Sequence, residues 1–173
     1  MNEDRVLSWL VIVATTVFAL NALPNRSAAV DNPPPLPVAR ADVAPEHIEE
    51  IAAAIAVAEG YYARGEHDGR SLPYRLNNPG ALKKPALGAA DLPTWQDTGL
   101  VIFPTPDMGW AALRHQVRLM LTGGSRIYDP SDTLTTVARK YTGGDQSHGW
   151  SWSVARSLGV GPDATLADLL PGR

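Results

Sequence analysis

The feature that most limits how this chain can fold is an apolar run at residues 6–23, followed almost at once by a proline-rich stretch. The run reads VLSWLVIVATTVFALNAL. It is longer than the roughly 7–15 apolar residues of a signal-peptide core and close to the roughly 20 that cross a bilayer. Residues 1–23 are therefore predicted to be an export segment. Its length favours an uncleaved transmembrane anchor, and a signal peptide cleaved after Ala29 is the alternative.

Residues 24–40 form a predicted linker. Their sequence, PNRSAAVDNPPPLPVAR, contains a run of three prolines and favours extended polyproline conformations over packing. The linker leaves residues 41–173 for one folded domain, which we expect to be a monomer. The domain is expected outside the cytoplasm, in the periplasm or facing the cell wall, and either anchored in the inner membrane or secreted.

Composition excludes several classes of function. The chain has no cysteine, so disulfides and thiolate metal sites are excluded. Its net charge is -3, which gives no support for nucleic acid as a partner. The four histidines lack the spacing of a metal site, and no nucleophile elbow or phosphate-binding glycine loop is present. We therefore expect no metal and no cofactor.

The folded domain is predicted to be mostly α (α+β), with helices around a small β-hairpin region. The first helix is expected to begin at Pro45, because proline and the acidic residues after it suit a helix N-terminus. A second helix is signalled by Thr105, Pro106 and Asp107 and stops at Gly123. The short segment LVIF at residues 100–103 is a strand candidate, paired near Ala81 and Leu82 or near Trp95.

Three further helices are expected towards the C-terminus. The first runs through residues 134–141 and is capped by Asp129 or Ser131. The others cover residues 151–158 and residues 165–170. The stretch between Gly65 and Gly80 is expected to be a loop, because it is rich in glycine, proline and asparagine.

Glu59 is the strongest candidate for a catalytic residue in the sequence. Steps of four and three residues from Ile48 lead through Ile55 to Glu59, so this carboxylate lies on the apolar face of the first helix. Burial disfavours a charged carboxylate, and the negative end of the helix acts in the same direction. A raised pKa suits a general acid that still carries its proton near neutral pH. A buried structural carboxylate, held by backbone or by an arginine such as Arg64 or Arg75, is the alternative.

Several motifs resemble those of a known superfamily. They are the string AEGY at residues 58–61, the string NNPGAL at residues 77–82, Phe103 and Gly109 leading into a helix, Tyr141, and residues 152–160. Together they look like the lysozyme-like superfamily, the phage and bacterial muramidases and lytic transglycosylases. Ala81 departs from the pattern, because asparagine is common after this turn in the family.

The resemblance implies a lysozyme-like fold and an enzyme that cleaves the MurNAc-GlcNAc bond of peptidoglycan glycan strands. The glutamate at the end of the first helix, Glu59, would be the catalytic acid. In a hydrolase a second carboxylate stabilises the oxocarbenium-like ion or activates water. In a lytic transglycosylase the 6-hydroxyl of the muramic acid attacks instead. The best second carboxylate is Asp68, and an exposed turn aspartate is the alternative interpretation.

The remaining candidates would act around that acid. Tyr141 is expected to direct its hydroxyl towards Glu59, or else to be a core tyrosine. Candidate substrate-binding residues are Asn77, Asn78, Gly80, Trp150 and Trp152, whose alternative roles are an ordinary turn and core packing. A peptidoglycan-binding or structural module without catalysis is the competing function, because a fold does not fix an activity. A chitin-type substrate also remains open.

Overall fold

The computed structural model describes residues 43–64, 69–83, 92–144 and 147–170. The chain divides into two units, Met1–Leu36 and Pro37–Arg173, and every described residue belongs to the second. The predicted export segment and the whole of the predicted linker fall before residue 43, outside the described residues. Within the described ranges, no helix has the length and apolar character needed to cross a membrane.

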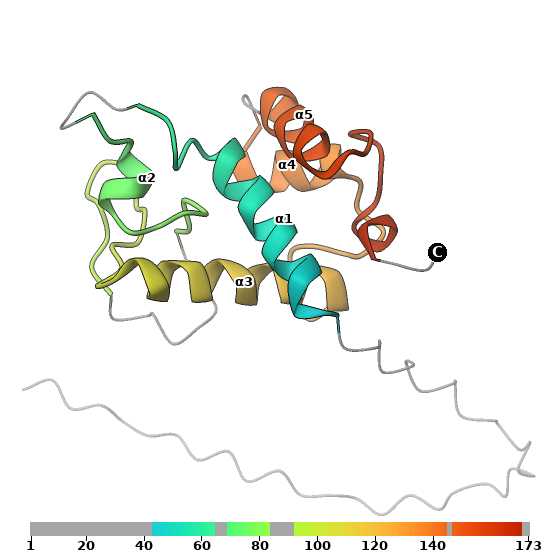
Figure 1. Cartoon of the computed structure of the whole chain (residues 1–173), viewed down its shortest axis with the longest axis horizontal. Coiled ribbons are helices and arrows are strands. Elements are labelled where there is room, and N and C mark those ends of the chain that lie inside the picture. Colours follow the sequence, from blue (N-terminus) through green and yellow to red (C-terminus); the bar gives the residue numbers. More distant parts are fainter. Residues whose placement is uncertain (1–42, 65–68, 84–91, 145–146, 171–173) are drawn as a thin grey trace, which may run out of the picture. The chain divides into compact units, whose positions relative to one another are not determined.

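The described residues form a mostly helical domain, which confirms the predicted class (Figure 1). Five α-helices and one 3-10 helix follow one another along this part of the chain: α1 (Pro45–Ala58), α2 (Leu72–Arg75), α3 (Pro106–Thr122), α4 (Leu134–Thr142), α5 (Ser147–Leu158) and η2 (Leu166–Leu169). Helix α1 packs against α3 and α5, and α4 packs against α5. The core therefore lies among these four helices.

Helix α1 begins at Pro45, as predicted, and ends in a glycine turn that places Glu59. Gly60 has a φ of 71°, in the left-handed region that glycine adopts without strain. The backbone N–H groups of Gly60 and Tyr61 donate to the carbonyls of Val57 and Ala56, at 3.0 and 2.9 Å. This is the Schellman arrangement that closes many helices. Glu59 is therefore the last residue before the chain leaves the helix.

Helix α3 also has its predicted ends. The side chain of Thr105 accepts a hydrogen bond from the backbone N–H of Met108, and Gly123 ends the helix with a φ of 74°. Figure 1 shows α3 running along the domain below the region of α2, with the N-terminal end of α1 crossing its right-hand part in this view. Its first turn lies against the loop before it, since a Cβ atom added at Gly109 would be 1.8 Å from the Asn77 carbonyl oxygen.

Three predicted details are wrong. Helix α4 is capped by Thr133, whose hydroxyl accepts from the Thr136 N–H at 3.2 Å, and not by Asp129 or Ser131. Helix α5 begins at Ser147, about one turn before the predicted start. The stretch predicted as a loop contains α2, because Ser71 caps its first turn and a proline occupies that turn.

The predicted hairpin is reduced to a few hydrogen bonds. Among the described residues the pairing between Thr94 and Val101 is an isolated antiparallel bridge and no sheet forms. Val101 donates to the Leu82 carbonyl at 2.9 Å, and Trp95 donates to the Leu100 carbonyl at 2.7 Å. Both of the predicted neighbours therefore contact the 100–103 segment, which runs between them.

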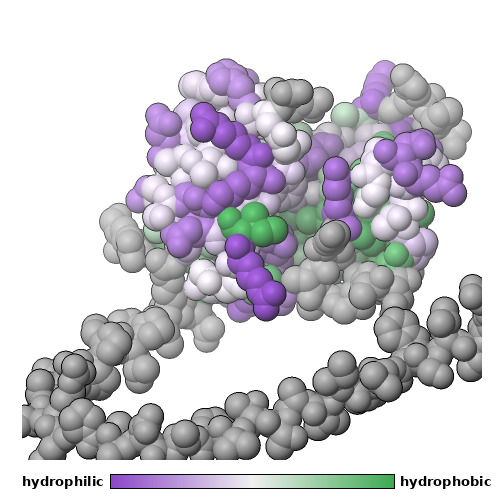
Figure 2. Space-filling view, turned by 180° about the vertical axis from the view of Figure 1, so that it is seen from behind, coloured by the Kyte–Doolittle hydropathy of each residue, from purple (hydrophilic) through white to green (hydrophobic). Residues whose placement is uncertain are grey.

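The surface carries only scattered large apolar side chains among the described residues. The face shown in Figure 2 is mostly hydrophilic where grey atoms do not cover it, with hydrophobic side chains in separate areas. Exposed large hydrophobic residues come from several elements: Val57, Tyr62, Tyr74, Trp95, Met108, Ile127 and Trp152. Singly exposed apolar residues are normal for a folded protein and indicate no particular partner.

Candidate active site

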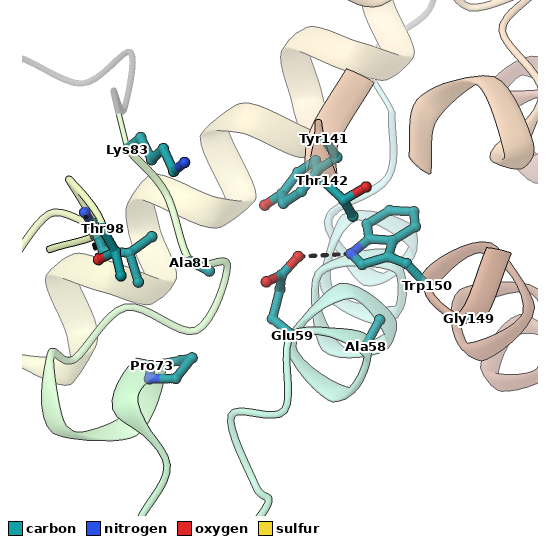
Figure 3. Close-up of a pocket in the computed structure, with 11 residues that line it drawn as sticks. Ala58, Glu59, Pro73, Ala81, Lys83, Thr98, Tyr141, Thr142, Gly149 and Trp150 are labelled. Atoms are coloured by element: carbon teal, nitrogen blue, oxygen red, sulfur yellow. Dashed lines mark hydrogen bonds between the residues drawn. The ribbon is translucent and has the colours of Figure 1, made fainter. Parts of the chain in front are cut away.

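A cavity of about 770 Å³ lies between the helical part of the domain and the loop part (Figure 3). One wall comes from the end of α1, the end of α4 and the beginning of α5, and the other from α2 and the segments around residues 81–83 and 98–100. The described lining residues are Ala58, Glu59, Pro73, Ala81, Lys83, Thr98, Leu100, Tyr141, Thr142, Gly149 and Trp150. A volume of this size lies in the range of small-molecule binding sites.

Glu59 lies on the wall of this cavity with its carboxyl group facing the open space (Figure 3). Its Oε1 atom accepts a hydrogen bond of 2.7 Å from the indole Nε1 of Trp150. The other carboxyl oxygen has no hydrogen-bond partner among the described residues. Two of the candidate residues therefore lie side by side, although Trp150 was assigned to substrate binding or core packing from the sequence and this contact was not predicted.

The environment of Glu59 favours the protonated form of its side chain. Burial raises the pKa of the carboxyl above its ordinary value, because the charged form loses hydration. The hydrogen bond from Trp150 lowers the pKa by a smaller amount, because the indole N–H stabilises the carboxylate. The net shift is upward. The direction of this shift is the one that a general acid working near neutral pH needs.

Two tyrosines lie close enough to respond to the charge of Glu59. Burial and then the Glu59 carboxylate raise the pKa of Tyr128 to about 12. The same two causes, in the same order, raise the pKa of Tyr141 well above its ordinary value. Both phenols therefore stay protonated near neutral pH and keep an O–H group that can donate a hydrogen bond.

Tyr141 bridges the two walls of the cavity. Its hydroxyl donates a hydrogen bond of 2.6 Å to the carbonyl oxygen of Gly80, across the cavity from α4. Its ring lies against Trp150, with centroids 5.1 Å apart and planes inclined by 31°. The expectation that the hydroxyl points to Glu59 is corrected, because that proton is directed at Gly80. Tyr141 holds the loop and supports the indole that contacts the acid.

Replacing Tyr141 with phenylalanine is expected to lower the free energy of unfolding by about 1–3 kcal/mol, because the Gly80 carbonyl loses its donor. Urea denaturation measures the change. Tyr62→Phe is the matched control, since the Tyr62 side chain is 63% exposed and its hydroxyl has no hydrogen bond among the described residues. Equal stability of the two variants would contradict the bridging role.

The asparagines of the Asn-Asn-Pro-Gly turn serve the backbone in this structure. The Asn78 side chain is fully buried and donates to the carbonyls of Leu82 and Val101, both at 2.9 Å, while its Oδ1 accepts from the Leu82 N–H at 2.8 Å. Asn77 donates to the Phe103 carbonyl at 2.9 Å and adopts a φ of 53°. Neither lines the cavity. Both amides fix the shape of the loop instead of facing a ligand.

The remaining predicted site residues take different positions. Gly80 is buried beneath the cavity wall, where an added Cβ would be 2.7 Å from Leu113 and 3.0 Å from the Tyr141 hydroxyl. Trp152 is 52% exposed, does not line the cavity, and donates its indole N–H to His148 at 3.2 Å. Asp68 lies outside the described residues. The structure therefore brings Glu59, Tyr141 and Trp150 together.

Three polar residues and one glycine of the cavity wall were not among the predicted catalytic or substrate-binding residues. They are Lys83, Thr98, Thr142 and Gly149. Lys83 follows the Asn-Asn-Pro-Gly-Ala-Leu string directly, and the sequence offers two interpretations of the Lys83-Lys84 pair: a contact for peptide-stem carboxylates, or a solvated charged loop. Thr98 gives no such signal, because its position depends on the turn between Trp95 and Leu100.

No group of three or more His, Cys, Asp or Glu side chains within the described ranges is arranged to hold a metal ion. The chain matches no protein-family model, and comparisons with curated proteins and with solved structures give no match. The case for a function therefore rests on the geometry of the cavity and on the motifs of the sequence.

Proposed function

We propose that this protein is a lysozyme-like enzyme that cleaves the glycosidic bond between N-acetylmuramic acid and N-acetylglucosamine in peptidoglycan, with Glu59 as the general acid. One observation carries the proposal. A half-buried glutamate with a raised pKa faces a cavity whose volume lies in the range of small-molecule binding sites. The resemblance of the Glu-Gly and Asn-Asn-Pro-Gly motifs to lysozyme-like enzymes supports the choice of substrate.

The hydrogen bond from Trp150 determines which oxygen delivers the proton. An indole N–H is a donor only, so Oε1 of Glu59 must accept from it. The acidic proton is therefore carried by Oε2, the oxygen without a partner among the described residues. Proton transfer from Oε2 to the glycosidic oxygen breaks the bond as the sugar carbon gains oxocarbenium character. The Glu59 carboxylate that remains then accepts a proton from the attacking hydroxyl.

Two routes complete the reaction from this point. Attack by the 6-hydroxyl of the same muramic acid gives a 1,6-anhydro end, and attack by water gives a reducing end. Glu59 is the only carboxylate among the described lining residues, and Asp68, the candidate for a second one, lies outside the described residues. Both routes use the same general acid, and the chemistry of the product end distinguishes them.

The test is mass spectrometry of the material released when the full chain is incubated with purified peptidoglycan, with the Glu59→Gln protein in parallel. Release that requires Glu59 supports the proposal, as anhydro-muramic ends for a lytic transglycosylase or as reducing ends for a muramidase. Release of neither product by wild-type protein that still binds peptidoglycan would favour a non-catalytic binding module.

Replacing Trp150 with phenylalanine is expected to extend activity to higher pH. The indole N–H stabilises the charged carboxylate, so its loss raises the pKa of Glu59 further. A general acid works below its pKa, and the alkaline limb of the kcat/KM profile therefore moves upward. Trp152→Phe is the matched control, because that indole contacts His148 outside the cavity. A downward shift for Trp150→Phe, or equal profiles for both variants, would contradict the assignment.

A further inference from the structure

The described lining of the cavity contains one cation that the proposed cleavage reaction does not use. Lys83 lines the wall opposite Glu59, and Figure 3 shows its side chain extending towards the open space. Among the described lining residues, Glu59 is the carboxylic acid and Lys83 is the amine, and the phenol of Tyr141 stays neutral. Lys83 has no ion pair with any described residue. A lysine ammonium group with no partner is available to an anionic group of a ligand.

The backbone that carries Lys83 is held in place. The buried Asn78 side chain bonds both the N–H and the carbonyl of Leu82, the residue immediately before Lys83. The Val101 N–H donates to the same Leu82 carbonyl at 2.9 Å. The buried amide of the Asn-Asn-Pro-Gly turn therefore fixes the point from which the lysine side chain extends.

The formal charge of the described cavity lining differs in sign from the net charge of the chain. When Glu59 carries its proton, as a general acid must, Lys83 is the remaining formal charge on the described lining. The whole chain has a net charge of -3. A local positive site in an acidic protein attracts an anion by its position and not through a general excess of basic residues.

We propose that Lys83 is a specificity-determining residue that binds the carboxylate of an acidic amino sugar, and so distinguishes muramic-acid glycans from neutral chitin-type glycans. The inference rests on the proposed function and deepens it by choosing between two substrate classes. Each muramic acid carries a carboxyl group on its lactyl ether, either free or extended by a peptide that itself ends in carboxylates. A chitin chain of the same length has the same ring shape and no negative charge.

The test measures binding by full-length protein that carries Glu59→Gln, so that no ligand is cleaved. Three tetrasaccharides serve as probes: the GlcNAc-MurNAc repeat with free lactyl carboxylates, the same repeat with peptide stems, and chitotetraose. Introducing Lys83→Gln into the Glu59→Gln protein is expected to weaken binding of one or both muramyl probes by about tenfold. The affinity for chitotetraose is expected to stay unchanged. The probe that responds identifies whether the lactyl group or the stem supplies the carboxylate.

Two further variants make the result specific. Lys83→Arg keeps the positive charge and is expected to retain most of the preference for muramyl probes. Arg156→Gln removes one positive charge from the exposed end of α5, away from the cavity lining, and is expected to change no affinity. An equal loss for chitotetraose and the muramyl probes, or no loss in Lys83→Gln, would overturn the inference.

The outcomes separate this inference from the proposed function. If the wild-type protein cleaves peptidoglycan and Lys83→Gln still prefers muramyl probes, the role of Lys83 is wrong and the function stands. If the wild-type protein cleaves nothing while the preference depends on Lys83, the enzyme proposal fails and the binding specificity stands. Binding of none of the three probes by the Glu59→Gln protein would overturn the inference outright.

Discussion

Replacing Glu59 with glutamine is expected to reduce the rate of peptidoglycan cleavage by about 100- to 10,000-fold, the usual contribution of a positioned general acid. Glutamine has nearly the same shape as glutamic acid, and its carbonyl oxygen can still accept the hydrogen bond from Trp150. The variant therefore keeps the architecture of the cavity and loses only the transferable proton. The rate of release of soluble fragments from labelled peptidoglycan measures the effect.

The same variant is expected to gain stability relative to the wild type at alkaline pH. Burial raises the pKa of Glu59 in the folded state, so the folded protein binds this proton more tightly than the unfolded chain does. The contribution of Glu59 to stability is therefore fully present below its unfolded pKa and is lost as the pH rises through its folded pKa. Glutamine has no such dependence, and thermal unfolding at several pH values measures the difference.

Glu46→Gln is the matched control for both measurements. Glu46 is an exposed carboxylate in the first turn of α1, the helix whose C-terminal end carries Glu59. Its replacement is expected to leave cleavage unchanged and to cost less than about 1 kcal/mol, the value of a surface charge at a helix N-terminus. Full cleavage activity in Glu59→Gln would refute the assignment of the general acid.

Gly109→Ala is expected to destabilise the domain by about 3 kcal/mol or more, because the added methyl group would overlap backbone. A Cβ atom at this position would lie 1.8 Å from the carbonyl oxygen of Asn77 and 2.9 Å from its carbonyl carbon. A flexible side chain could move away from such a contact, but a backbone carbonyl held in a turn cannot. Helix α3 would have to separate from the loop, and the midpoint of chemical denaturation measures the cost.

Gly149→Ala is expected to have the opposite effect on stability, at a second glycine that lies within a helix. Gly149 lies within α5, is exposed, and has no atom within 4 Å of an added Cβ apart from its immediate surroundings in the helix. Alanine there is expected to stabilise the domain by about 0.5–1 kcal/mol through its higher helix propensity. Comparable destabilisation of the two variants would mean that the close approach at Gly109 is not what limits the substitution.

Local signals in the sequence were sufficient for several elements of this fold. Pro45 at the start of α1 and the Thr105 to Asp107 segment at the start of α3 act within one helical turn, so their effects can be read without knowledge of the tertiary structure. Glu59 could be recognised as unusual for a similar reason. Helical spacing alone placed a carboxylate on an apolar face.

The roles of other residues depended on contacts that spacing does not encode. Asn78 was predicted to face a ligand, but its burial follows from the approach of Val101, 23 positions further along the chain. The hydroxyl of Tyr141 donates to Gly80, 61 positions away. The sequence before α4 contains several residues that can cap a helix, and local spacing does not choose among them. Thr133 is the cap in the structure, where it also pairs with Thr165, a contact that forms only in the folded domain. Long-range packing therefore decided these details.

The contacts around the cavity close into a ring. Helix α1 joins α3, the first turn of α3 abuts Asn77, Gly80 accepts from Tyr141 of α4, and α4 leads through α5 back to α1. Among the described residues, separating the two walls of the cavity would break at least one of these contacts. Folding therefore sets how far apart the backbone segments that carry Glu59 and Lys83 lie. If the proposed function holds, a glycan strand would adapt its ring conformations to the spacing of these walls. The conformational entropy of ordering the site would then be lost when the protein folds and not when the ligand binds.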